Sequence, residues 1–562
     1  MVDRFFRLFH REFNGLHEAA LLLGLSAIFS QFLALARDRL LASSFGAGSA
    51  LDIYYAAFRI PDILYVSLAS LVSVTVVLPF IVKHLEDEDQ AAATRLMFDL
   101  FSRFLSFISI AALIAFSLMP RLALLVAPGF SPAALAELVL LSRIMLLSPI
   151  LLGLSNLVSN ITQASRKFFL FALSPIFYNL GIIVGILFLY PEFGPAGLAW
   201  GVILGATGHL MIQLPAIISG PISWASVLKP KVRSGEWKKI FLLSWPRTLT
   251  LSANQLTIFV LVALASSLAA GSIALFNFAY NLQSVILSVI GVSYSVAAFP
   301  SLARCLSNGE KSKFIEQMSF AVRNIVFWSL PAIGLFIVLR AHIVRVVLGA
   351  GRFDWSNTRL TAAALVIFLF SVVAQSLILL FVRGYYAGGH TTKPLIINVF
   401  SSILTIGLAF TFLNLVKVDP TLINGLAQLL RVGDVPGIKF LVLPLAFSVG
   451  AIVNLIILWR FFQSDFGLFP KEVYRGAWQS ALSAIVAAGV TYLGLALLAP
   501  FFDQATFLGI FLQGLSAGLF GIFTHIFLLK KLGNTELVLI GRAVRHKLWH
   551  RFHPVIPETE SL

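Results

Sequence analysis

Long apolar runs, each followed by a short polar or charged stretch, recur along the whole chain. A helix needs about 20 consecutive apolar residues to cross the hydrocarbon core of a bilayer. The fourteen runs that approach or exceed this length are residues 19–41, 51–82, 104–126, 138–164, 168–190, 197–217, 240–268, 272–299, 325–348, 360–385, 394–415, 440–462, 478–498 and 507–529. The pattern predicts an all-α polytopic membrane protein with about 14 transmembrane helices.

Composition supports this class. Only 12% of the residues are charged and 59% are hydrophobic, with a mean hydropathy of +0.92, whereas soluble proteins carry about 25% charged residues. The net charge of +16 indicates a basic membrane face held against anionic lipid rather than a nucleic-acid partner. The single cysteine, Cys305, excludes an intramolecular disulfide.

The loop charges predict an orientation. Four alternate connections carry no Lys or Arg, namely residues 43–50, 191–195, 269–272 and 499–506. The connections on the other side are rich in Lys and Arg, as in KPKVRSGEWKK at 229–239. Two outward loops, at 345–359 and 417–439, break the pattern. Because basic loops stay in the cytoplasm, we expect both termini there.

An internal repeat divides the chain. Leu41-Ala42-Ser43-Ser44, followed by Gly48-Ser49, recurs as Leu264-Ala265-Ser266-Ser267, followed by Gly271-Ser272. Both copies begin on the cytoplasmic side, so the repeat is parallel. We therefore expect two parallel six-helix lobes plus two C-terminal helices: residues 1–225 (spans 1–6), 226–465 (spans 7–12), 466–530 (two extra spans) and a basic cytoplasmic tail at 531–562.

Charges inside the apolar runs are the candidates for function, because a charge in the bilayer costs a few kcal/mol unless it finds a partner, water or a ligand. The first two runs contain Arg37, Asp38, Asp52 and Arg59. Asp52 and Arg59 align in the repeat with Leu275 and Leu282, so the scaffold folds without those charges. The second half contributes Arg247, just after Pro246, and the amides Asn254, Gln255, Asn277, Asn281 and Gln283.

Each candidate also has a structural interpretation. Arg37 and Asp38 could form a local ion pair, and Asp52 could cap its own span. Arg59 could pair with Asp52 or Asp62, and Arg247 could anchor at the interface. The sequence contains no phosphate-cradling loop, metal-spaced cluster or nucleophile elbow. We therefore expect no catalytic residue, metal or cofactor.

The segment FxxxARDxxxAxxFGAGxxxDxxxxAFRIP, at Phe32–Pro61, closely resembles the N-terminal signature of the MurJ/MviN family of lipid II flippases in the MOP exporter superfamily. VAPGF at 126–130, FPSLAR at 299–304, GRF at 351–353 and RGYYAGGHTTKP at 383–394 extend the resemblance. It implies a bacterial inner-membrane transporter that moves the undecaprenyl-pyrophosphate-linked peptidoglycan precursor outward by alternating access. Membrane lipid and cell-wall synthesis proteins are the other implied partners.

We expect a substrate site at Arg37, Asp38, Asp52, Arg59, Arg247 and Asn281, of which the resemblance implies the first four as retained family positions. The chain departs from the family pattern elsewhere: family arginines correspond to Gln31, Tyr65 and Asn281, a glycine to Ala34, and an acidic-glycine pair to Ser70-Leu71. A polar position linked to sodium in the family corresponds to Leu261. Most of the family's cavity cations are therefore missing.

Three functions follow from these residues. The first is lipid II flipping. The second is export of another polyprenyl-linked oligosaccharide, favoured by the missing cations. The third is a non-transporting membrane scaffold for cell-wall assembly. A membrane-embedded glycosyltransferase fits less well, because no outward loop carries a set of catalytic carboxylates.

The predicted orientation can be tested by cysteine labelling from outside intact cells. Cysteines introduced at Ala47 and Pro195 should react with an impermeant thiol reagent, because both lie in predicted outward connections. Cysteines at Ser234 and Lys531 should not react. Labelling at Ser234 would reverse the orientation.

Overall fold

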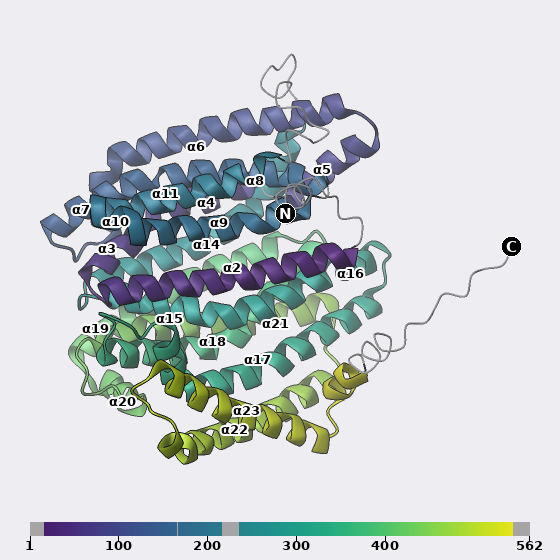
Figure 1. Ribbon diagram of the computed structural model, residues 1–562. Coiled ribbons are helices and arrows are strands. Elements are labelled where there is room, and N and C mark those ends of the chain that lie inside the picture. The colour runs from purple at the N-terminus through teal and green to yellow at the C-terminus, as the bar shows by residue number, and fades with distance from the viewer. Residues whose placement is uncertain (1–15, 73, 166, 216–234, 543–562) are drawn as a thin grey trace, which may run out of the picture. The chain divides into compact units, whose positions relative to one another are not determined.

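The computed structural model describes residues 16–72, 74–165, 167–215 and 235–542, and every regular element in these ranges is a helix (Figure 1). The N-terminal segment 1–15, most of the basic loop before Lys238, and the tail beyond 542 lie outside the described residues.

The helices before that loop are α2 (Leu16–Phe45), α3 (Ser49–Ala57), α4 (Arg59–Ala69), the short 3-10 helix η1 (Ser70–Val72), α5 (Val74–Glu86), α6 (Gln90–Val126), α7 (Pro132–Met145), α8 (Leu147–Ala164), α9 (Phe168–Val184), the π-helical η2 (Gly185–Leu189), α10 (Tyr190–Phe193) and α11 (Pro195–Met211). Those after it are α14 (Trp237–Ser266), α15 (Ser272–Ile286), the π-helical η3 (Leu287–Val292), α16 (Ser293–Ser307), α17 (Lys311–Val347), α18 (Trp355–Ala387), α19 (Thr392–Val418), α20 (Thr421–Leu429), η4 (Ile438–Leu441), α21 (Val442–Phe466), α22 (Lys471–Leu498), η5 (Ala499–Phe501) and α23 (Phe507–Lys531).

Twelve stretches of the described chain are long and apolar enough to cross a membrane. They coincide with twelve of the predicted spans, so the all-helical, membrane-spanning class is confirmed. The first and sixth predicted spans fall on α2 and α11, which are not among the twelve; α11 has 17 residues. The number fourteen stays a prediction.

Local sequence explains several helix ends. The Ser131 hydroxyl accepts a hydrogen bond from the backbone N–H of Ala134, and Pro132 follows it at the first helical position of α7. Asp89 caps α6 in the same way, through the N–H of Ala92. These side chains satisfy backbone donors that have no partner within the helix.

The second predicted span has a local irregularity at Phe58, between α3 and α4. Phe58 keeps helical backbone angles, and its carbonyl accepts the N–H of Asp62 at 2.7 Å. Pro61 lies in the first turn of α4, where its missing N–H costs least. The span therefore continues through Arg59 as part of one membrane-crossing stretch, Ser49–Glu86.

The described chain forms two compact units. In the first, which comprises the described parts of 1–279, 347–364 and 391–450, α2 packs on α9, α11 packs on α8 and α9, and α14 contacts α4, α6 and α19. In the second, α22 and α23 lie side by side (Figure 1), and Arg323 on α17 pairs with Glu536 at 3.0 Å. The lobes predicted at 1–225 and 226–465 follow the sequence repeat and stay a prediction.

The two turns of the repeat make reciprocal contacts within the first unit. Arg352 donates its backbone N–H to the carbonyl oxygen of Ser43 at 2.9 Å, and Gly351 lies against the same carbonyl. Gly129 lies against the carbonyl of Ser266, the repeat-mate of Ser43, and donates its N–H to the Ser266 hydroxyl at 3.2 Å. Each turn is thus held by the glycine loop that follows the third span of the other repeat. This exchange supports the parallel repeat.

The two predicted outward loops that break the charge pattern contact each other. Arg359 donates to Asp434 at 2.7 Å and also to the backbone carbonyl of Arg431. The guanidinium of Arg359 holds the pKa of Asp434 below its usual range, mainly through this hydrogen bond. Because Arg359 is paired with an acidic residue nearby, its presence in a predicted outward loop is explained in part by this local pairing.

The glycine contacts can be tested by adding one methyl group. A Cβ at Gly129 or Gly351 would lie 2.3 Å from a backbone carbonyl oxygen, so Gly129→Ala and Gly351→Ala should each cost about 1–3 kcal/mol of stability. The measurement is thermal unfolding of the purified protein in detergent. Gly407→Ala is the control, because its Cβ meets nothing within 4 Å. Equal midpoints for all three variants would contradict the close approach.

Candidate functional site

Arg37 is held by two neighbours. Its Nε and Nη2 donate to the same oxygen of Asp38, at 3.0 and 2.8 Å. Its Nη1 donates to the side-chain carbonyl of Asn179 on α9 at 3.1 Å. The predicted local ion pair is therefore present, and the guanidinium also ties α2 to α9.

Asp52 contacts the other repeat. The carboxylate is buried at 3% exposure, and its oxygens accept the backbone N–H groups of Gly271 at 2.6 Å and Ala274 at 2.8 Å. These donors lie at the start of α15, where a helix has unsatisfied N–H groups and a partial positive charge. Asp52 therefore caps the eighth predicted span. The alternative suggested by the sequence, that Asp52 caps the second span on which it lies, is wrong.

Arg59 is the most buried of the candidate cations, at 9% exposure. Its Nε donates to the carbonyl of Tyr55 at 3.2 Å, and its Nη2 donates to the side-chain oxygen of Asn277 at 3.1 Å. Asn277 stands on α15, so Arg59, like Asp52, reaches from the first repeat into the second. A neutral amide therefore accepts one of its charged donors.

Tyr55 contacts Arg59 through its backbone carbonyl, which accepts the Nε donor at 3.2 Å. Its ring packs edge-on against Phe278 with ring centroids 5.8 Å apart. The hydroxyl is buried without a hydrogen-bond partner among the described residues. Because buried hydroxyls nearly always have a partner, this oxygen marks a place where a ligand or water belongs. We call Arg37, Asp38, Tyr55, Arg59, Asn179 and Asn277 the arginine site.

Two further candidates lie on neighbouring helices. Arg247 is half-buried on α14, whose N-terminal half is bound to the second span through the Thr248–Ser70 hydroxyl pair at 2.7 Å. Asn281 follows Asn277 by one helical turn on α15 and belongs to the second unit. The predicted role of both residues in substrate binding stays a prediction.

Two members of the site, Asn179 and Tyr55, were missed from the sequence. Asn179 is a lone amide in the otherwise apolar run of α9, where it also donates to the carbonyl of Pro175 at 3.0 Å. A polar side chain within a span is a reason to suspect a functional role, so Asn179 could have been identified. Tyr55 stands four residues before Arg59 on the same side of the helix, but tyrosine is common in apolar runs and does not by itself indicate a site.

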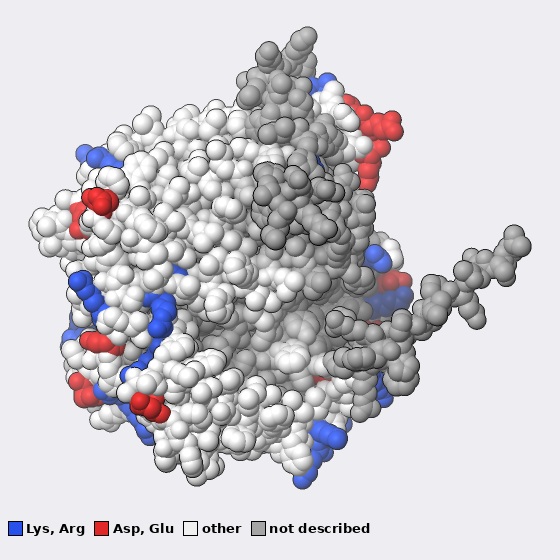
Figure 2. All heavy atoms as spheres, viewed as in Figure 1, with Lys and Arg blue, Asp and Glu red and all other residues white. Residues whose placement is uncertain are grey.

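The surface fits a protein surrounded by lipid. Figure 2 shows the helix sides of the first unit almost free of charged residues, with Lys, Arg, Asp and Glu near helix ends and loops. In the part of the chain that the structure describes, no three His, Cys, Asp or Glu side chains gather as a metal ion would require.

The cap by Asp52 predicts a measurable loss. Asp52→Ala leaves two N–H groups at the start of α15 without their acceptor, which should cost about 1–3 kcal/mol. Thermal unfolding of the purified protein is the measurement. Ser49→Ala is the matched control, because Ser49 is exposed on the same helix. An unchanged midpoint for Asp52→Ala would remove its role in joining the repeats.

Comparison with known proteins shows which family the chain resembles. Residues 41–512 match the family model described as lipid II flippase MurJ. A probable lipid II flippase MurJ of Buchnera aphidicola subsp. Acyrthosiphon pisum is 26% identical over 389 residues, covering 68% of this chain and 75% of that protein. The lipid II flippase MurJ of Burkholderia cenocepacia is 24% identical over 477 residues, covering 83% and 87%.

Solved structures show the same fold. The lipid II flippase MurJ in an inward closed conformation matches with a TM-score of 0.71 at 20% identity, covering 91% of this chain and 99% of that chain. An inward-facing multidrug resistance MATE family transporter of the MOP superfamily matches with a TM-score of 0.62 at 14% identity, covering 79% and 98%. The family model spans most of the chain, and the fold agrees: the chain belongs to the lipid II flippase MurJ family.

Proposed function

We propose that this chain flips lipid II, the undecaprenyl-pyrophosphate-linked peptidoglycan precursor, from the inner to the outer leaflet of the bacterial inner membrane by alternating access. Family membership and the MOP-type fold support a transporter rather than an enzyme. The observation that carries the proposal for this chain is the arginine site, where the buried Arg59 donates to a neutral amide and the half-buried Arg37 is paired with Asp38.

The two arginines differ in how readily they can take a phosphate. Arg37 donates twice to the carboxylate of Asp38 and once to the amide of Asn179, so a phosphate would share this guanidinium with a carboxylate or displace it. Arg59 donates to the neutral amide of Asn277. A hydrogen bond between two charged groups is roughly twice as strong as a neutral one, so a phosphate oxygen displaces Asn277 more easily than Asp38. Arg59 is therefore the principal phosphate ligand in this proposal, and Arg37 orients the site.

Binding and movement are linked through Asn277. Arg59 and Asp52 both connect the first repeat to α15. When a pyrophosphate replaces Asn277 as the acceptor for Arg59, one side-chain link between the repeats is removed. In an alternating-access transporter the repeats move against each other, so the same event that binds the substrate loosens the contact that opposes movement.

The precursor's identity has one specific competitor. Where the family pattern has an arginine on the second span, this chain has Tyr65, whose hydroxyl accepts a hydrogen bond from Asn156 at 3.0 Å. With fewer cations, the site also suits another polyprenyl-pyrophosphate-linked oligosaccharide with a less acidic head. Vesicle assays with lipid II and with a neutral-glycan analogue of the same lipid distinguish the two cargoes.

The test is transport of fluorescent lipid II in vesicles reconstituted with purified variants. Arg59→Ala should lower the rate by roughly ten- to a hundredfold, as expected for the loss of a charge-assisted bond. Arg59→Lys should retain part of the activity, because an ammonium lacks the paired donor fork. Arg121→Ala, which removes an exposed cation on α6, is the matched control and should transport normally.

Asn277→Ala separates ligand binding from a purely structural role. If Arg59 serves only to hold α15, losing its acceptor should damage transport as much as losing Arg59 itself. If Arg59 binds phosphate, Asn277→Ala should keep most of the rate. Normal transport by Arg59→Ala, or equal losses in both variants, would refute the assignment, and failure of all variants with lipid II but not with the analogue would change the cargo.

A further inference from the structure

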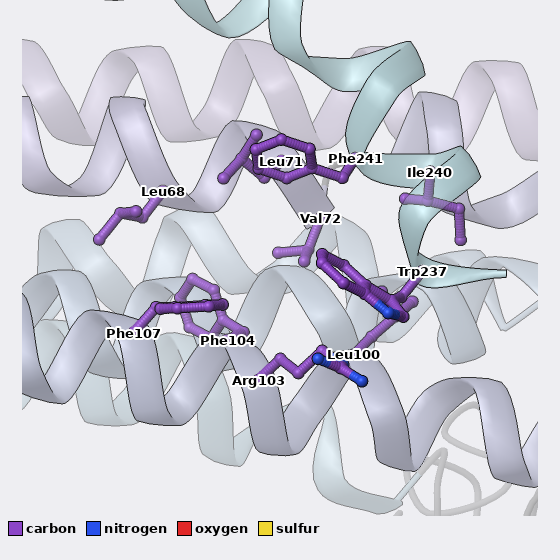
Figure 3. Close-up of a pocket in the computed structure, with 10 residues that line it drawn as sticks. All are labelled: Leu68, Leu71, Val72, Leu100, Arg103, Phe104, Phe107, Trp237, Ile240 and Phe241. Carbon is purple, nitrogen blue, oxygen red and sulfur yellow. The ribbon is translucent and has the colours of Figure 1, made fainter. Parts of the chain in front are cut away.

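An apolar cavity of about 60 Å³ lies in the first unit, away from the arginine site. It is bordered by the end of α4, η1, the middle of α6 and the start of α14 (Figure 3). Its lining is Leu68, Leu71, Val72, Leu100, Arg103, Phe104, Phe107, Trp237, Ile240 and Phe241. Arg103 is the single charged residue among them.

Arg103 is fixed on two sides and open on a third. Its Nε donates to Asp99 at 2.9 Å, and its guanidinium carbon lies 4.3 Å from the centre of the Trp237 ring. The side chain is 27% exposed. The structure records no hydrogen bond from either Nη group to the residues it describes. Two parallel donors held in a fixed plane are the arrangement that matches two oxygens of a phosphate.

The surface beside the cavity consists of exposed apolar side chains, which suit contact with acyl chains. Phe107 on α6 is 57% exposed, and Leu242 and Trp245 on α14 are 71% and 46% exposed. In a membrane-spanning chain these side chains contact lipid, so the cavity continues the lipid-facing surface inward between α6 and α14. A cavity of this size accommodates a few methylene groups and not a whole lipid.

Charge near the cavity favours an anion. Asp99 neutralises Arg103 by pairing with it, but Lys238 and Lys239 at the start of α14 are exposed. The Lys239 ammonium lies 5.8 Å from the ring of Phe80, which packs against the same core as Leu100, Phe104 and Ile240. Lysines at this position add about 1 kcal/mol each to the attraction of an anionic lipid surface.

The depth of the site also suits a headgroup. Arg103 immediately precedes the third predicted span, and Trp237 precedes the seventh, at the side that the loop charges predict to be cytoplasmic. Tryptophan and arginine at the edge of a span are typical of the headgroup level.

We infer that this cavity binds one anionic phospholipid, with its phosphate on the Nη groups of Arg103 and a segment of one acyl chain between α6 and α14. The lipid joins the third span to the first span of the second repeat. The site is separate from the arginine site, and its occupancy does not depend on what the protein transports.

Native mass spectrometry of the full chain in detergent tests this inference. Dioleoylphosphatidylglycerol should be retained at one tight site, whereas dioleoylphosphatidylcholine, with the same chains and no net charge, should bind roughly tenfold more weakly. Glycerol phosphate, which has the headgroup alone, should not compete at equal concentration, because it lacks the chain. Competition by glycerol phosphate would show a phosphate site without a lipid, and would overturn the proposal.

Variants locate the site. Arg103→Gln should weaken phosphatidylglycerol binding by roughly tenfold, and Arg121→Gln, which removes an exposed cation from the same helix, should not. Leu68→Trp fills the cavity and should weaken the binding of both lipids while keeping every charge.

Because Arg103→Gln could harm folding, Arg103→Lys provides a second measurement. This variant keeps the positive charge but loses the paired donors of the guanidinium, so it should also bind phosphatidylglycerol more weakly. Equal retention by Arg103→Lys and Arg121→Gln, or an unchanged Leu68→Trp, would refute the inference.

Discussion

The contact on which the first unit depends is a carboxylate of one repeat bound to the backbone of the other. Asp52 lies at 3% exposure, where an unpartnered charge would be costly. It is stable there because two N–H groups at the start of α15 point at it. The same N–H groups would lack an acceptor without Asp52. The charge that looked unnecessary for the scaffold, because its repeat-mate is Leu275, is therefore used to hold the two repeats together.

The arginine site shows how a buried cation can be both stable and available. Arg59 has acceptors, so its burial is tolerated, but one of them is a neutral amide. Arg37 has a carboxylate beside it and is held more firmly. One guanidinium is thus suited to exchange partners with an incoming anion and the other to keep its position. Tyr55, whose carbonyl accepts from Arg59, has a hydroxyl without a hydrogen-bond partner among the described residues.

The fold class and most helix positions could be predicted from the sequence, because each apolar run is long and each loop is short and polar. The turns of the repeat were also predicted, since their residues recur. The partners of the charges were not. Arg37 binds Asn179, which is 142 residues away, and Asp52 binds backbone groups that have no sequence signature. Periodicity identifies a helix, but it does not say which distant helix lies opposite.

The reciprocal glycine contacts have a consequence for how far this family can diverge. At both Ser43 and Ser266 a glycine without a side chain lies against the main-chain carbonyl. The Ser43 carbonyl accepts a backbone N–H, whereas at Ser266 the acceptor is the side-chain hydroxyl. The close approach itself therefore depends on the glycines rather than on the side chains that surround them. Substitutions can accumulate across the helix surfaces without altering this contact, provided that the glycines remain. In this chain, therefore, the contact between the repeats tolerates change on the surrounding helix surfaces but not at Gly129 and Gly351, where a single methyl group would meet a carbonyl oxygen.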